Sequence, residues 1–380
     1  MWFRLVTLVF MEVAANRLVA QDQAFKEAFG LYQAGSLAQA HRRLEATEVK
    51  TRSALDWSLL GTIEYQTGDL GQSEIHLRDA ITKEPGLAGA RSTLAAVLEA
   101  QGKLEQASEQ LAWLQKRSPR DVHLLLATAR VQNMRGNSEA ALAAALQAKR
   151  AVPKDPAVLY AVGVLCLQMD LIKDATANLE QAAALQPNPT VLYALASARI
   201  ANRDMASAID IYQDLIKADS DNAQFNYALG AAYFLENQNE AAKPYFERSL
   251  AKQPNQVESM YYLALIAEQS GENEKSIDLL REVIRRNPDH ARAYVALGVE
   301  YRSLGRLAES KNELERAVRL DPESQKAHYQ LGLVLNALKE QDEAKKQLEL
   351  ATRLRTSADE KVSWRLLPEG PNAKHAGDAP

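Results

Sequence analysis

The side chains that could carry chemistry are scattered along this chain of 380 residues. No two of its six histidines have the spacing that places both on one helix face to bind a metal. The chain has no HExxH motif, no glycine-rich phosphate loop after a strand and no G-x-S-x-G element. Its carboxylates form no recognisable acid/base pair. The sequence therefore predicts no enzyme, no metal site and no cofactor. The histidines are expected to be surface or half-buried side chains: His41, His76, His123, His290, His328 and His375.

Cysteine usage and charge exclude further classes of protein. The single Cys166 lies in an apolar run, so an intrachain disulfide is excluded and the thiol is expected to pack as a small buried hydrophobe. A net charge of -4 with 25% charged residues gives no field that would hold a polyanion. Basic pairs such as Arg42-Arg43 are expected on solvated helix faces, since useful phosphate affinity needs many contacts. We expect no nucleic-acid partner and no small-molecule substrate.

An internal repeat is the first feature to look for in a long helical sequence, and this chain matches itself at a shift of about 34 residues. Prolines recur at this interval, and Ser220 and Thr356 interrupt their series. The prolines are Pro85, Pro119, Pro153, Pro187, Pro254, Pro288 and Pro322. A glycine often lies near the middle of the unit, at Gly68, Gly102, Gly136, Gly271 and Gly305.

Two columns of small residues flank that glycine. The first column is Gly61, Ala95, Ala129, Gly163, Ala196, Gly230, Ala264, Gly298 and Gly332. The second column is Ser73, Ala107, Ala141, Ala175, Ala208, Ala242, Ser276, Ser310 and Ala344. Four residues after the second column comes a bulky apolar residue, with Ala145 as the exception. Small residues are needed where two helices cross closely, because a large side chain would hold the backbones apart.

These spacings indicate two helices in each unit. Apolar residues recur at three- and four-residue intervals, and strand-type alternation is absent. Glycine or a polar residue ends the first helix, and proline after the second prevents it from continuing. The sequence therefore predicts an all-α protein of tandem helix pairs.

The order Trp57, Leu60-Gly61, Tyr65, Gly68, Ser73, Ala80, Pro85 resembles the signature of the tetratricopeptide repeat. Tyr294, Leu297-Gly298, Tyr301, Gly305, Ala317 and Pro322 resemble it again. Ten units are in phase, over residues 21–53, 54–87, 88–121, 122–155, 156–188, 189–222, 223–256, 257–290, 291–324 and 325–358. The resemblance implies a right-handed α-α superhelical solenoid whose concave wall is lined mainly by the first helices, with partners along that wall.

Energy explains why the units form an array over 21–358. Ordering each backbone residue costs on the order of 1–2 kcal/mol, while each buried apolar side chain returns roughly 1.5–3 kcal/mol. A single unit has too few such side chains to fold alone, so neighbouring units are expected to supply the missing contacts and build a continuous core. No second domain is expected.

The ends differ from the array. Residues 1–20 are interpreted as a degenerate export signal, with an ordinary leading helix as the alternative. The apolar stretch there is too short to span a bilayer, so membrane proximity is expected only through this terminus. Residues 359–367 are expected to form a short capping helix and 368–380 a disordered tail. The export signal and the alanine-rich repeats favour a bacterial, periplasmic protein, with the cytoplasm as the alternative.

One column of the first helices is rich in tyrosine, with Val295 as the interruption. The tyrosines are Tyr160, Tyr193, Tyr227, Tyr261 and Tyr329. Residues four and seven positions further along fall on the same helical stripe; they include Arg130, Asn133, Ser197, Phe234, Glu268, Arg302 and Asn336. Tyrosine is enriched in protein interfaces, so we predict a groove for an extended or helical peptide. The alternative is that the rings pad contacts between successive first helices.

The predicted function is a non-catalytic scaffold or adaptor that binds a protein or peptide. Some proteins of the resembled family grip terminal carboxylates of chaperone tails with lysine and asparagine, but the corresponding columns here hold Tyr160, Tyr193, Val164 and Ser197. Chaperone tails are therefore not the expected ligand. Two alternatives stay open. The chain could be the detached recognition arm of a separate transferase, such as a protein O-glycosyltransferase, or a self-assembling structural element.

Overall fold

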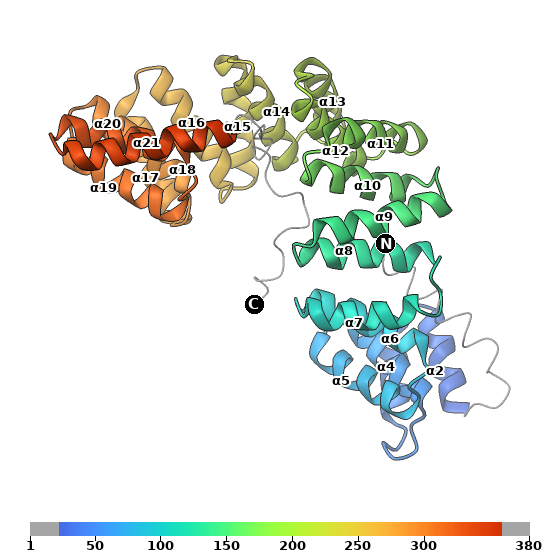
Figure 1. Ribbon diagram of the computed structural model, residues 1–380. Helices are drawn as coiled ribbons and strands as arrows, with labels where there is room; N and C mark the ends of the chain where they lie inside the picture. Colours follow the sequence, from blue (N-terminus) through green and yellow to red (C-terminus); the bar gives the residue numbers. More distant parts are fainter. Residues whose placement is uncertain (1–22, 359–380) are drawn as a thin grey trace. The chain divides into compact units, whose positions relative to one another are not determined.

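The computed structural model describes residues 23–358, and every regular element in this range is an α-helix. The helices follow one another as alternating first and second helices of successive repeats (Figure 1). This confirms the prediction of an all-α helical repeat. The expected export signal, capping helix and tail lie outside the described residues. No helix within 23–358 combines the length and apolar character needed to cross a membrane.

The first helices of the pairs are α2 (Gln23–Gln33), α4 (Ala54–Thr67), α6 (Ala88–Ala100), α8 (Val122–Met134), α10 (Pro156–Gln168), α12 (Pro189–Ala201), α14 (Ala223–Leu235), α16 (Val257–Gln269), α18 (Ala291–Ser303) and α20 (Gln325–Ala337). The second helices are α3 (Leu37–Glu45), α5 (Leu70–Lys83), α7 (Leu104–Gln115), α9 (Ser138–Ala151), α11 (Ile172–Leu185), α13 (Met205–Ala218), α15 (Asn239–Lys252), α17 (Asn273–Arg286), α19 (Leu307–Leu320) and α21 (Gln341–Ala358).

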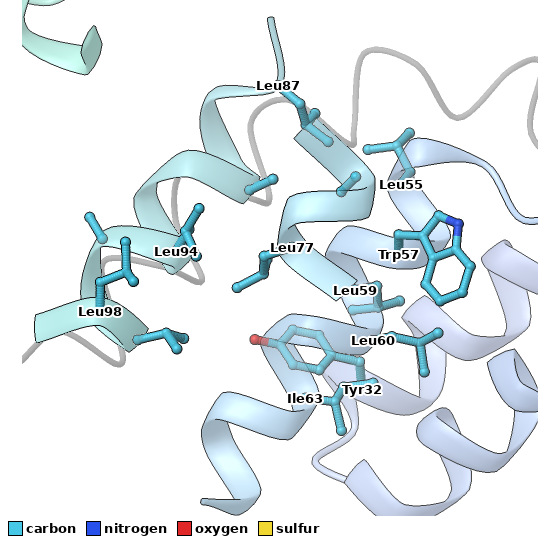
Figure 2. Packing of buried hydrophobic residues seen from close by; sticks show 14 of the residues in the cluster. Tyr32, Leu55, Trp57, Leu59, Leu60, Ile63, Leu77, Leu87, Leu94 and Leu98 are labelled. Carbon is cyan, nitrogen blue, oxygen red and sulfur yellow. The ribbon is translucent and has the colours of Figure 1, made fainter. Parts of the chain in front are cut away.

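The described residues fall into two compact units, 23–169 and 170–358. Unit 1 holds α2 to α10, and its core gathers apolar side chains from first and second helices alike. Leu60 on α4, Leu77 on α5 and Leu94 on α6 are all buried in it (Figure 2). Unit 2 holds α11 to α21 and has apolar clusters of its own. Both units are built from helices of the same repeating pattern, and the boundary between the units falls between α10 and α11.

Side-chain caps fix where several first helices begin. Asp121 and Asp155 each accept hydrogen bonds from two backbone N–H groups in the first turn of α8 and α10. Asn222 does the same for α14. These groups would otherwise lack partners, because the first four N–H groups of a helix have no intrahelical acceptor.

Close helix crossing accounts for the small-residue columns. A methyl group added to Gly298 would lie 2.6 Å from Cγ of Leu314, and one added to Gly61 would lie 2.6 Å from Cγ of Leu77. Real side chains do not approach so closely, so the first and second helices of these pairs pack too tightly for any residue larger than glycine without a local shift.

Serine in the second column joins the same helices by a hydrogen bond. The Ser73 hydroxyl donates to the Gly61 carbonyl oxygen at 2.6 Å, and Ser310 donates to Gly298 at 2.5 Å. Ser276 occupies the same column, but alanine replaces glycine opposite it and its buried hydroxyl has no partner. The serine hydroxyl therefore forms this hydrogen bond where the opposite residue is glycine and the two helices cross more closely.

Two histidines are more buried than predicted. His290 is 6% exposed and His328 is 3% exposed. His290 accepts the Ala293 N–H at 3.0 Å and caps α18, and its other ring nitrogen lies 3.2 Å from a Glu258 oxygen. The expectation of surface or half-buried side chains is therefore wrong at these two positions, because both rings have hydrogen-bond partners inside the repeat.

Candidate peptide-binding site

Three tyrosines of the predicted groove point into the interior of unit 2. Tyr193, Tyr227 and Tyr261 are 8%, 0% and 6% exposed. Each lies on a first helix and contacts side chains of the same pair or the next. Their burial corresponds to the alternative in which the rings pad contacts between helices. The exposed surface that a ligand would meet must therefore be sought on other side chains.

The environment of Tyr193 illustrates this packing. Its ring meets Tyr212 on α13 edge to face, with centroids 5.6 Å apart. Gln224 Nε2 on α14 donates to the Tyr193 hydroxyl at 2.7 Å. Burial raises the pKa of Tyr193 to about 12, and the Gln224 bond opposes the rise only in part. The phenol thus stays neutral and joins two successive first helices.

Tyr261 belongs to a network of charged and aromatic groups between α16 and α18. The Arg292 guanidinium lies 4.9 Å from its ring centroid, within cation–π range. The Glu258 carboxylate accepts from Arg292 and lies 3.2 Å from His290 Nε2. Burial raises the pKa of Glu258, but His290 and Arg292 outweigh burial, so the pKa is lowered overall. This network is satisfied internally and leaves little for a ligand to bind.

The predicted residues of unit 1 are an ion-paired arginine and two half-buried side chains. Arg130 on α8 forms a two-point ion pair with Glu99 on α6, one contact being 2.9 Å between Nη2 and Oε2. Burial raises the pKa of Glu99 more than Arg130 lowers it. Tyr160 is half-buried on α10, and burial raises its pKa. Asn133 is half-buried near the end of α8.

A different column stays open on unit 2. It occupies the last-but-one position of four first helices and consists of Phe234 on α14, Glu268 on α16, Arg302 on α18 and Asn336 on α20. We call it the terminal stripe. Asn336 is exposed and the other three side chains are half-buried. Successive helices of this set contact one another, so the stripe crosses neighbouring repeats.

The members of the terminal stripe differ in how they are held. The Phe234 ring meets Tyr262 edge to face, with centroids 5.0 Å apart. Arg302 forms no ion pair within residues 23–358, and its buried Nε has no hydrogen-bond partner. Tyr329, seven residues before Asn336 on the same face of α20, is 44% exposed. Four predicted residues, Phe234, Arg302, Asn336 and Tyr329, therefore remain accessible on one unit.

The buried carboxylates of Glu64 and Glu300 were not predicted from the sequence. Glu64 on α4 is contacted by two histidines: His76 Nδ1 lies 2.8 Å from one carboxylate oxygen and His41 Nε2 lies 3.1 Å from the other. Glu300 on α18 is 2% exposed. A signal for Glu300 was available, because every other repeat from α4 onward has an apolar residue at its position. These residues are Ile63, Val97, Val131, Leu165, Ala198, Ala232, Ile266 and Val334.

Solved structures of helical repeat proteins resemble this chain. A tetratricopeptide repeat protein from Parabacteroides merdae ATCC 43184 is 16% identical, with a TM-score of 0.57 over 65% of this chain and 98% of its own. MamA from Desulfovibrio magneticus RS-1 is 21% identical, with a TM-score of 0.39 over 44% of this chain and 96% of its own. YrrB, described as having an unusual peptide-binding site, is 20% identical, with a TM-score of 0.37 over 48% and 95%. The first of these structures has a TM-score above 0.5, and its similarity supports the all-α repeat fold.

No curated protein matches the sequence. Family models do match it, and none of them describes a catalytic domain. A model described as a tetratricopeptide repeat covers residues 93–156, 167–223, 193–242, 227–291 and 269–310, more than half of the chain. A TPR repeat model covers 300–339, and a further tetratricopeptide repeat model covers 325–357. The chain therefore belongs to the tetratricopeptide repeat family.

Proposed function

We propose that this protein is a non-catalytic scaffold that binds an extended segment of a partner protein across the terminal stripe of unit 2. The observation that carries the proposal is the stripe itself. Its residues recur on four adjacent first helices, yet their side chains remain at least partly accessible. The neighbouring tyrosine column is buried at three of its positions, so its residues are chosen by packing between helices. The residues of the terminal stripe are not constrained in this way and can be chosen to fit a ligand.

The chemistry of the terminal stripe suits a peptide. Phe234 offers flat apolar area, as does Tyr329 beside the stripe on α20. Glu268 and Arg302 offer charges of both signs, and Asn336 offers an amide that can pair with a peptide backbone. Aromatic and arginine side chains are enriched among residues that dominate binding energy. Phe234 is held by Tyr262, so little side-chain freedom is lost when a ligand covers it.

The test is a selection of peptides on the folded full chain, followed by titration of a selected peptide against variants. The triple variant Phe234→Ala, Arg302→Ala, Asn336→Ala should weaken binding by at least about 100-fold, since a few residues dominate the binding energy of an interface and truncation of each of these costs about 2 kcal/mol or more. Calorimetry measures the affinities, and circular dichroism checks that the variant remains helical.

A matched control uses the same residue types on a second helix. Asn312 and Arg319 are exposed on the second helix α19. The variant Asn312→Ala, Arg319→Ala should bind the selected peptide as the unmodified protein does. Equal loss in both variants, or no loss in the triple variant, would remove the terminal stripe from the account.

A further inference from the structure

Glu300 is an anomaly in the core of unit 2. It lies on α18 at a position where the first helices from α4 onward otherwise carry isoleucine, valine, leucine or alanine. The residue is 2% exposed, and its Oε1 is buried without a hydrogen-bond partner. Within residues 23–358 its carboxylate forms no ion pair. A buried carboxylate without a partner carries a large desolvation cost, which packing alone does not explain.

A second carboxylate lies close to Glu300. Glu268 of the terminal stripe sits on α16, which contacts α18, and its side chain is half-buried. Burial raises the pKa of Glu268, and the negative charge of Glu300 raises it further. The two acidic groups therefore come from adjacent first helices, and Glu300 acts electrostatically on Glu268 of the terminal stripe.

Two basic residues, Lys326 and Arg302, could neutralise these carboxylates, but neither forms an ion pair with Glu268 or Glu300 in the described residues. Lys326 on α20 exerts an electrostatic effect that lowers the pKa of Glu268, yet it forms no ion pair with either carboxylate in the described part of the chain. Arg302 follows Glu300 by two residues, and its Nε also lacks a partner. The negative charge of the pair is thus left without a cation in direct contact.

We propose that Glu268 and Glu300 form a receptor for one cationic side chain, lysine or arginine, of a partner segment lying on the terminal stripe. This inference rests on the proposed function and adds the chemical class of the ligand. Two carboxylates from different helices can accept charge-assisted hydrogen bonds from one ammonium or guanidinium group. The incoming cation would supply the partner that the buried Glu300 lacks.

The apolar residues at the position of Glu300 in the other repeats suggest the most informative substitution. Glu300→Val installs the residue that the next repeat has at Val334, so it should raise the midpoint of thermal unfolding while it removes the receptor charge. Glu300→Gln keeps the shape and removes the charge. Glu349 is exposed on α21, and Glu349→Gln serves as the matched control. A purely structural role for Glu300 would change stability and leave ligand preference unaltered.

The probe is a set of labelled peptides with one sequence selected on the full chain and a single varied position carrying lysine, arginine, glutamine or glutamate. The full chain should bind the best lysine or arginine peptide at least about tenfold more tightly than its glutamine counterpart. This ratio should fall to near one in Glu300→Val and Glu300→Gln, and stay unchanged in Glu349→Gln. Fluorescence anisotropy measures the ratios.

Three results would overturn the inference. The ratio could be near one in the unmodified protein, it could persist in Glu300→Gln, or Ca²⁺ could abolish it and raise the unfolding midpoint only when Glu300 is present. In each case loss of binding by the stripe variant would still uphold the proposed function. Failure of all peptides to bind would overturn both.

Discussion

At the scale of single residues, one backbone conformation recurs in all ten repeats. A residue with positive φ follows each first helix, and in six repeats it is glycine. The other four are Asp170, Arg203, Asn237 and Lys339, with φ between 57° and 66°. Aspartate and asparagine tolerate this left-handed conformation better than longer side chains do. Arg203 and Lys339 therefore carry strain that glycine would relieve.

Lys339→Gly should stabilise the protein by about 0.5–1 kcal/mol, the strain relieved less the greater freedom of glycine in the unfolded chain. Urea unfolding followed by circular dichroism measures the change. The matched control is Lys345→Gly, at an exposed position inside α21, which should destabilise by about 1 kcal/mol. If both variants lose stability alike, the turn at Lys339 holds no strain.

The same scale limits what sequence can reveal about the site. Periodicity correctly placed Tyr193, Tyr227 and Tyr261 on one column of the first helices. It could not decide whether that column was covered, because coverage depends on neighbouring side chains such as Gln224 and Arg292. Glu300 could have been found as the charged residue in an apolar column, but its missing partner becomes visible only in three dimensions.

At the scale of helices, the pairs are held by close crossings at glycine. The sequence columns predicted that small residues lie where helices cross, and the short distances around Gly61, Gly298 and Gly332 support this explanation. The hydrogen bonds from Ser73 and Ser310 were not predicted. The sequence reveals that a serine in this column is small. Whether its hydroxyl forms a hydrogen bond depends on how closely the backbone carbonyl of the opposite helix approaches.

Gly298→Ala should destabilise the protein by about 1–3 kcal/mol, because the new methyl group would push Leu314 and lengthen the Ser310 bond. Gly71→Ala is the control, since its methyl group would meet Asp69 Oδ1 at an ordinary 3.7 Å inside α5. That control should be neutral or stabilising by up to about 1 kcal/mol. Thermal unfolding distinguishes them, and equal effects would contradict a close crossing at Gly298.

At the scale of the whole molecule, repetition made the fold predictable. Ten copies of one pattern indicated first and second helices in alternation, and the described residues hold twenty helices in that order. The division after Met169 has no counterpart in the repeating columns, because those columns record packing inside a pair and between adjacent pairs. Ligand choice is equally hidden, since it depends on the residues that packing leaves free.

The most direct measurement places a photo-crosslinking amino acid, benzoylphenylalanine, in the full chain at one of two asparagine positions. One position is Asn336 of the terminal stripe, and the other is Asn312 on the second helix α19. With a peptide selected on the unmodified protein, we predict a covalent adduct from position 336 and none from position 312, read by mass spectrometry. An adduct from position 312 alone, or equal adducts from both, would contradict binding across the terminal stripe.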